Sequence, residues 1–309
     1  MTLLPRIKLE LKRNQSDVLA LVLLAAWPLA FFWPAALRQA VFSFGDISLF
    51  FYPTHLAYAN ALHALKLPLW EPKILAGFPL FAEGQIGALY PTHPFLYGLL
   101  PIDIATNYDI LLHLVWVAMG TYLIARMWKL QPPSAFLTAF TFSMGGFFLP
   151  RLQHMSVLAT ASWLPWLMWT WEKYEHETSW QKKLRWFALL ALMSGVQLLG
   201  GHPQFAFSSA VLLSLYAVVR WDRGPHTRPP LFSSKGKRWA LVDLFLEYID
   251  LSRLIPLALF FGIGAAIAAV QLVPLFELSS LTNRAGGLEA RFFNAFSLRP
   301  PHFLMLFNP

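Results

Sequence analysis

Seven apolar segments, several of them about twenty residues long, constrain this chain more than any other feature. About 20 apolar residues in a helix are enough to cross the hydrocarbon core of a bilayer. Only 13% of the residues are charged and 57% are hydrophobic, whereas roughly a quarter of an ordinary soluble domain is charged. We therefore predict an all-α, polytopic membrane protein, with one transmembrane domain over residues 1–309 and about seven transmembrane helices. The expected spans are residues 18–37, 105–128, 134–149, 157–171, 186–199, 204–219 and 254–275.

The connection between the first two of these spans, residues 38–104, has a different character. Six prolines between Pro53 and Pro94 divide it into short turns and half-helices, so it cannot cross a bilayer as one helix. We expect this first loop to lie outside the cytoplasm and to contain short helices at the membrane surface.

The orientation is predicted from the lysines and arginines, because positively charged loops stay in the cytoplasm. The N-terminus and every second loop after it hold 17 of these residues, and the other set of loops holds 7. The N-terminus is therefore expected inside, and the basic loop of residues 221–253 becomes cytoplasmic. Its positive charge suits anionic lipid headgroups, so we expect no nucleic acid partner. The absence of cysteine excludes disulfides and thiolate chemistry.

Asp46 is the acidic residue on which the functional hypothesis depends. It follows the first apolar segment and lies among Phe44, Ile47 and Phe50. A carboxylate in apolar surroundings binds a proton more tightly, which suits a general base. The alternative is an N-cap for a helix that starts at Ile47, and the two roles are compatible.

Other acidic and histidine side chains of the same loop could act with Asp46. Oxygen and imidazole ligands suit magnesium or manganese, so a divalent metal site is one hypothesis, although no tight ligand spacing supports it. Asp109 and His113 stand one helical turn apart, and they are either a functional pair at membrane depth or solvated at the interface. The remaining candidate metal ligands are Glu71, Glu83, His55, His63 and His93.

Cationic side chains recur in the turns that are predicted to face outside. The turn before Gln204 contains a proline suited to the first position of a helix, and a helix start offers free amide donors to an anion. We therefore predict that these turns converge near Asp46 on a phosphate, although a plain glycine-proline turn and a snorkelling arginine explain the pattern equally well. The residues of this predicted phosphate site are Arg151, His154, His202 and Arg284.

A series of short motifs resembles the YfhO-like bacterial membrane proteins. The loop contains Gly45-Asp46, Tyr52-Pro53, Leu67-Pro68-Leu69-Trp70-Glu71-Pro72, Gly77-Phe78-Pro79, Gln85 and Tyr90-Pro91. Later stretches with the same resemblance are Phe142-Ser143-Met144-Gly145-Gly146-Phe147, Ala161-Ser162-Trp163-Leu164-Pro165-Trp166 and Gly201-His202-Pro203-Gln204.

The resemblance implies a GT-C type glycosyltransferase of the bacterial cytoplasmic membrane, with its active site on the outer face. Such an enzyme transfers a sugar from a polyprenyl-phosphate donor to a cell-envelope glycan or lipid, and its usual base corresponds here to Asp46. Family members are longer, so the chain is expected to be an N-terminal portion. A transporter or flippase for a lipid-linked substrate, or a non-catalytic membrane subunit, is the alternative. Candidate acceptor or loop residues are Glu71, Glu83, Gln85 and Gln204.

Overall fold

The structure is a computed structural model that describes residues 3–219, 251–282, 285 and 287. Within these ranges it is all helical, and the only extended pairing is an isolated bridge between Glu71 and Phe78. The long helices are α1 (Leu3–Phe31), α6 (Ile102–Met127), α7 (Pro132–Ser143), α9 (Leu164–His176), α10 (Trp180–Leu199), α11 (Pro203–Val218), α13 (Leu254–Ile267) and α14 (Ala269–Ser280). The short elements are α2 (Trp33–Ala36), the π-helical η1 (Ile47–Phe51), α3 (Tyr52–His63), α4 (Leu80–Glu83), α5 (His93–Leu99), the 3-10 turns η2 (Leu149–Arg151) and η3 (Leu251–Arg253), and α8 (Met155–Ala161).

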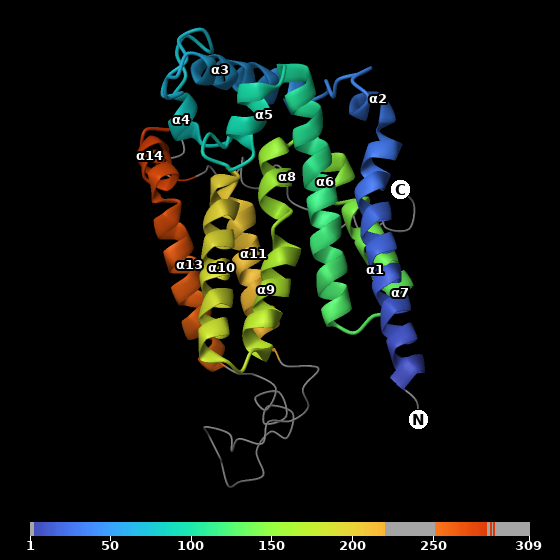
Figure 1. The fold of residues 1–309 in the computed structure, drawn as a ribbon. Coiled ribbons are helices and arrows are strands. Elements are labelled where there is room, and N and C mark those ends of the chain that lie inside the picture. Colours follow the sequence, from blue (N-terminus) through green and yellow to red (C-terminus); the bar gives the residue numbers. More distant parts are fainter. Residues whose placement is uncertain (1–2, 220–250, 283–284, 286, 288–309) are drawn as a thin grey trace, which may run out of the picture.

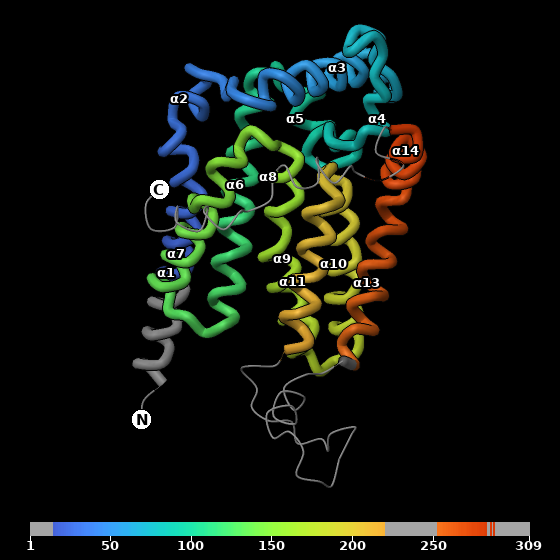
Figure 2. The backbone as a smooth tube through the Cα atoms, turned by 180° about the vertical axis from the view of Figure 1, so that it is seen from behind, coloured from blue at the N-terminus to red at the C-terminus, as the bar shows by residue number. Residues whose placement is uncertain are grey.

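Helices α6, α9, α10, α11 and α13 run alongside one another, and α3, α4, α5 and α14 gather at one end (Figure 1). Helices α1, α6 and α7 pack together, and α9, α10, α11 and α13 form the neighbouring group (Figure 2). α6 joins the groups because it also packs against α9. The chain between α1 and α6 makes a cap of short helices over the end away from the start of α1 (Figure 1).

Proline places the start of many of these helices. α7 begins at Pro132, α11 begins at Pro203, and α3, α5 and α9 also have proline in their first two positions. The first helical residues have no intrahelical acceptor for their N–H, so a proline loses nothing there, and its fixed φ angle already suits the helix. The prolines that prevent the first loop from forming one long helix therefore start the short helices of the cap.

The predicted spans correspond to the structure only in part. Among the described residues, α6 alone is long and apolar enough to cross a membrane by itself. α7 has 12 residues and ends at Ser143, which gives a length of about 18 Å instead of the span predicted to residue 149. The last predicted span is broken at Ala268, where α13 and α14 meet with a bend of 80°. A bundle of seven spanning helices is therefore not confirmed.

Candidate functional site

Asp46 lies directly before η1 in the cap, and its carboxylate pairs with His154. Oδ2 of Asp46 is 3.4 Å from Nε2 of His154, and these side chains are 50% and 41% exposed. The side chain of Asp46 makes no capping hydrogen bond, so the N-cap interpretation is wrong for this side chain. The carboxylate instead pairs with His154 and is half exposed to solvent.

The pair forms because two distant segments share one apolar cluster. Ile47 and Phe51 pack with Phe148 and Leu152, all nearly fully buried, in the same core cluster. This packing holds the start of the cap against the turn that ends at His154.

Gly45 permits this close approach. Its φ angle is +53°, and a Cβ atom built on it would lie 1.7 Å from Oε1 of Gln153. A side chain at this position would therefore push Gln153 aside and would adopt a left-handed conformation that residues other than glycine rarely use.

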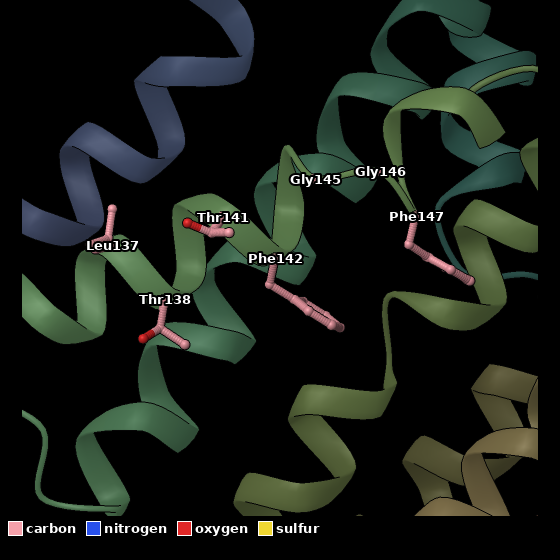
Figure 3. Close-up of a pocket in the computed structure, with 7 residues that line it drawn as sticks. All are labelled: Leu137, Thr138, Thr141, Phe142, Gly145, Gly146 and Phe147. Carbon is pink, nitrogen blue, oxygen red and sulfur yellow. The ribbon is translucent and has the colours of Figure 1, made fainter. Parts of the chain in front are cut away.

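Arg151 lies in the turn before His154 and contacts Phe147. Its Nη1 donates a hydrogen bond of 3.2 Å to the carbonyl of Phe147, and its guanidinium lies 4.4 Å from the centre of the Phe147 ring. Phe147 lines a hollow of about 550 Å³ along α7 (Figure 3). Arg151 is therefore linked to the hollow through Phe147, and neither Arg151 nor Asp46 is among the lining residues. Its other lining residues are Leu137, Thr138, Thr141, Phe142, Gly145 and Gly146.

His202 lies in the turn before α11, close to His154. The region that contains Asp46, Arg151, His154 and His202 is called the corner below. Its backbone N–H donates to Oγ1 of Thr160, and its ring contacts Phe205, which in turn contacts Phe147. Burial lowers the pKa of His202, and the nearby His154 lowers it further. Nδ1 of each of these two histidines is buried without a hydrogen-bond partner, so both rings keep unused hydrogen-bonding capacity.

Glu83 and Gln85 reach the same corner from the cap. The carboxylate of Glu83 accepts hydrogen bonds from the backbone N–H and the side-chain amide of Gln85, and Ser156 donates to Oε1 of Gln85. Burial raises the pKa of Glu83 by more than the two hydrogen bonds from Gln85 lower it, so the net shift is upward. A Cβ atom on Gly201 would lie 2.6 Å from the carbonyl oxygen of Gly84. The segment thus touches both the turn of His202 and the start of α8.

The remaining predicted residues lie elsewhere. Glu71 closes its own loop by accepting a hydrogen bond from the backbone of Lys73, beside the bridge to Phe78. Gln204 is exposed on the first turn of α11, and Arg284 lies outside the described residues.

The predicted metal ligands are not gathered together. In the part of the chain that the structure describes, no group of three or more acidic or histidine side chains is arranged to hold a metal ion. His63 bonds to the carbonyl of Gly98, while His55 and His93 meet beneath the cap with Asp109. The residues predicted to bind a metal therefore have other partners.

Asp109 and His113 are buried instead of solvated. Both lie on α6, where the Asp109 side chain is 3% exposed, and Tyr97 donates a 2.8 Å hydrogen bond to it. This cluster is a second carboxylate and histidine group, separate from the pair at Asp46. The spacing of Asp109 and His113 in the sequence indicated it, but nothing in the sequence indicated that His93 and Tyr97 complete it.

Comparisons with protein-family models, curated proteins and solved structures find no match for this chain. Its function is therefore inferred from its own residues and their geometry.

Proposed function

We propose that this chain is the core of a bacterial membrane glycosyltransferase, with the YfhO-like resemblance as its family, that moves a sugar from a polyprenyl-phosphate donor to a cell-envelope acceptor. The observation that carries the proposal is the half-exposed pair of Asp46 and His154, with Arg151 and His202 in the same corner. It provides a carboxylate to accept a proton, and a guanidinium with two imidazole rings to bind a phosphate.

In this proposal the helix bundle lies across the bilayer with the cap on the outer face. Large apolar side chains point outward over long stretches, as at Val18 of α1, Phe207 of α11 and Ile255 of α13, which are 61%, 70% and 67% exposed. Extended exposed apolar surface of this kind is rare on soluble monomers and suits lipid. The basic residues predict that the opposite end, where α1 begins, faces the cytoplasm.

The reaction assigned to this corner is a single displacement. The acceptor hydroxyl oxygen forms a bond to the anomeric carbon of the sugar, and its proton passes to Asp46. The bond between that carbon and the phosphate oxygen breaks, and the electron pair leaves with the polyprenyl phosphate. Arg151 and the histidines bind the phosphate as its charge increases, which stabilises the transition state.

The hollow along α7 suits the hydrocarbon chain of such a donor. Its walls are mainly apolar, with hydroxyls from Thr138 and Thr141 (Figure 3). The guanidinium of Arg151 lies 4.4 Å from the centre of the ring of Phe147, one of the lining residues. A phosphate bound by Arg151 would therefore be continuous with an apolar surface for the chain.

The test is Asp46→Asn in the full chain, in membranes that receive a labelled polyprenyl-phosphate sugar. The substitution keeps the size of the side chain but removes the proton acceptor. Sugar transfer should fall at least about a hundredfold, with donor binding little changed. Asp103→Asn is the matched control, because Asp103 is an exposed aspartate at the start of α6. Undiminished transfer in Asp46→Asn would exclude Asp46 as the base, and transport without any glycosylated product would favour a flippase.

A further inference from the structure

The buried cluster around Asp109 consists of charged and hydrogen-bonding side chains from two helices, α5 and α6. Nε2 of His93 is 3.4 Å from Oδ2 of Asp109, and Tyr97 donates to the same oxygen. The distance to His93 is long for a hydrogen bond but ordinary for an ion pair. Nδ1 of His113 lies 3.1 Å from Oδ1. All four side chains are almost completely buried.

The partners of His93 determine its charge. Nδ1 lies 2.9 Å from the carbonyl oxygen of Ile86, which can only accept, so Nδ1 carries a hydrogen. Nε2 faces the carboxylate of Asp109 and must carry a hydrogen as well, because two acceptors would repel each other. Burial lowers the pKa of His93, but the charge of Asp109 and its bonds raise it by more, so that the net shift is upward.

His113 contacts Asp109 from the next turn of α6. Its Nδ1 lies 2.7 Å from the main-chain carbonyl of Asp109 and donates to it. Its Nε2 lies 3.0 Å from the hydroxyl of Tyr90, which also accepts a hydrogen bond from Trp163. His113 thus connects Asp109 with Tyr90.

The ion pair holds one particular piece of the cap. The carbonyl of Ile86 accepts from His93 and also faces Nε2 of His55 at 3.3 Å. A Cβ atom on Gly87 would lie 2.9 Å from the ring of His93 on one side and 3.3 Å from the carbonyl of Leu199 on the other. Ile86 and Gly87 are therefore packed between the Asp109 cluster and the end of α10.

We propose that Asp109 is a positioning residue, whose ion pair with His93 fixes residues 83–90 so that Glu83 and Gln85 meet the turn of His202 and the start of α8. A buried ion pair is costly to desolvate, and removing one partner leaves the other uncompensated. The catalytic meaning of this positioning rests on the proposed function, whereas the positioning itself can be measured without it.

Several other titratable groups surround His93. Burial lowers the pKa of His55 to about 3, and the neighbouring His93 contributes to that shift. His55 takes up a proton when the segment is released, so it favours release as the pH falls below about 6.5. This contribution is the same in every variant that retains His55, and it cancels when two such variants are compared. The titratable groups around His93 are Asp109, His113, His55, Tyr97, Tyr90 and Tyr58.

The experiment uses single cysteines, because the chain has none of its own. A cysteine replacing Ala88, which is 4% exposed, reports release of the segment through its rate of labelling by an impermeant maleimide. A cysteine replacing the exposed Lys73 gives the reference rate at each pH, and one replacing Ala139, which is fully buried on α7, reports global unfolding. Asp109→Asn should speed labelling at Ala88 at least about tenfold at pH 6 relative to the unsubstituted protein, and labelling at Ala88 should stay faster than labelling at Ala139, because the segment is released without global unfolding.

The pH dependence distinguishes loss of the ion pair from a simple packing defect. With Asp109 present, His93 is protonated in both the closed and the released segment below about pH 6.5, so it contributes no slope there. In Asp109→Asn, burial without a partner keeps His93 neutral until the segment is released. Release of the segment in Asp109→Asn should therefore take up one more proton than in the unsubstituted protein. Between about pH 6.5 and 5, the labelling rate of the variant should gain an additional increase that approaches tenfold for each unit by which the pH falls.

The double variant Asp109→Asn with His93→Asn should lose this extra proton, because the asparagine side chain that replaces the imidazole cannot titrate, while its amide can still donate to Ile86. An unchanged slope in Asp109→Asn, or an extra slope that persists in the double variant, would overturn the proposal. Undiminished sugar transfer in Asp46→Asn would refute the glycosyltransferase but would leave this result intact, so the two failures are distinguishable.

Discussion

The two carboxylate and histidine pairs of this protein have the same separation and opposite surroundings. Asp46 and His154 lie 3.4 Å apart with side chains about half exposed, and Asp109 and His93 lie 3.4 Å apart with side chains 3% and 4% exposed. An exposed pair is screened by water and adds little stability, so its carboxylate can exchange protons with a substrate. A buried pair is held by its neighbours and costs stability when it is broken. Burial, more than residue type, therefore distinguishes the chemical role from the structural one.

The largest expected effect tests this difference directly. Asp109→Asn should lower the free energy of unfolding by about 3–5 kcal/mol, because it leaves the buried His93 without its partner. Asp46→Asn should change it by less than about 1 kcal/mol, because water screens the half-exposed pair. Thermal unfolding of both purified variants in the same detergent measures the two costs. Equal costs would remove the distinction between the pairs.

A second substitution tests whether the clamped segment must touch the turn of His202. Gly201 has a φ angle of +88°, and a Cβ atom there would meet the main-chain carbonyl of Gly84 at 2.6 Å. The φ angle and the contact both involve the main chain, which cannot move aside as a side chain can. Gly201→Ala should therefore lower the free energy of unfolding by about 3 kcal/mol, through backbone strain and displacement of Gly84. Gly262→Ala on α13 is the control, since nothing lies within 4 Å of a Cβ atom built there. Similar unfolding temperatures for the two variants would contradict the tight contact.

The sequence predicted the helical class and the approach of His154 to Asp46, but not the packing that brings them together. The order of apolar and proline-rich stretches was sufficient for the helical class and the cap, but not for the end of α7 or the break after α13. The meeting of Asp46 with His154 depends on Phe148 and Leu152 packing against Ile47 and Phe51, and no local pattern encodes such a long-range contact. His93 was interpreted as a metal ligand for the same reason, because its partner Asp109 lies on another helix.

The break between α13 and α14 was also beyond sequence reasoning. Hydrophobic residues continue through Ala268 without glycine or proline at the bend, so the pattern predicts one helix. α14 turns away and packs against α4, where Gln271 donates a hydrogen bond to the carbonyl of Phe81. A tertiary contact with the cap therefore accompanies the bend.

A smaller effect is expected at the open pair itself. Gly45→Ala should lower the free energy of unfolding by about 1–2 kcal/mol, because a residue with a side chain is disfavoured in the left-handed conformation of residue 45. It should also lower sugar transfer, because the new methyl group displaces Gln153 beside Asp46. Adding Gln153→Ala makes room for the methyl group but leaves the conformational cost. Transfer should then recover while stability does not, and a double variant that recovers neither would show that Gln153 is not the obstacle.

The smallest predicted effect concerns the hollow along α7, whose lining residue Phe147 contacts Arg151. Gly146 is exposed, and nothing lies within 4 Å of a Cβ atom built on it, so Gly146→Leu can fill the hollow without disturbing the fold. If the donor chain lies there, KM for a long-chain donor should rise severalfold, up to about tenfold, because the added side chain displaces a few buried methylene groups. KM for a donor with a short water-soluble chain, which does not reach the hollow, should stay the same.

The control is Gly262→Leu on α13, where nothing lies within 4 Å of a Cβ atom either. It should alter neither KM value. An equal rise for both donors would place the chain elsewhere and would attribute the change to Arg151, whose guanidinium lies over the neighbouring ring of Phe147.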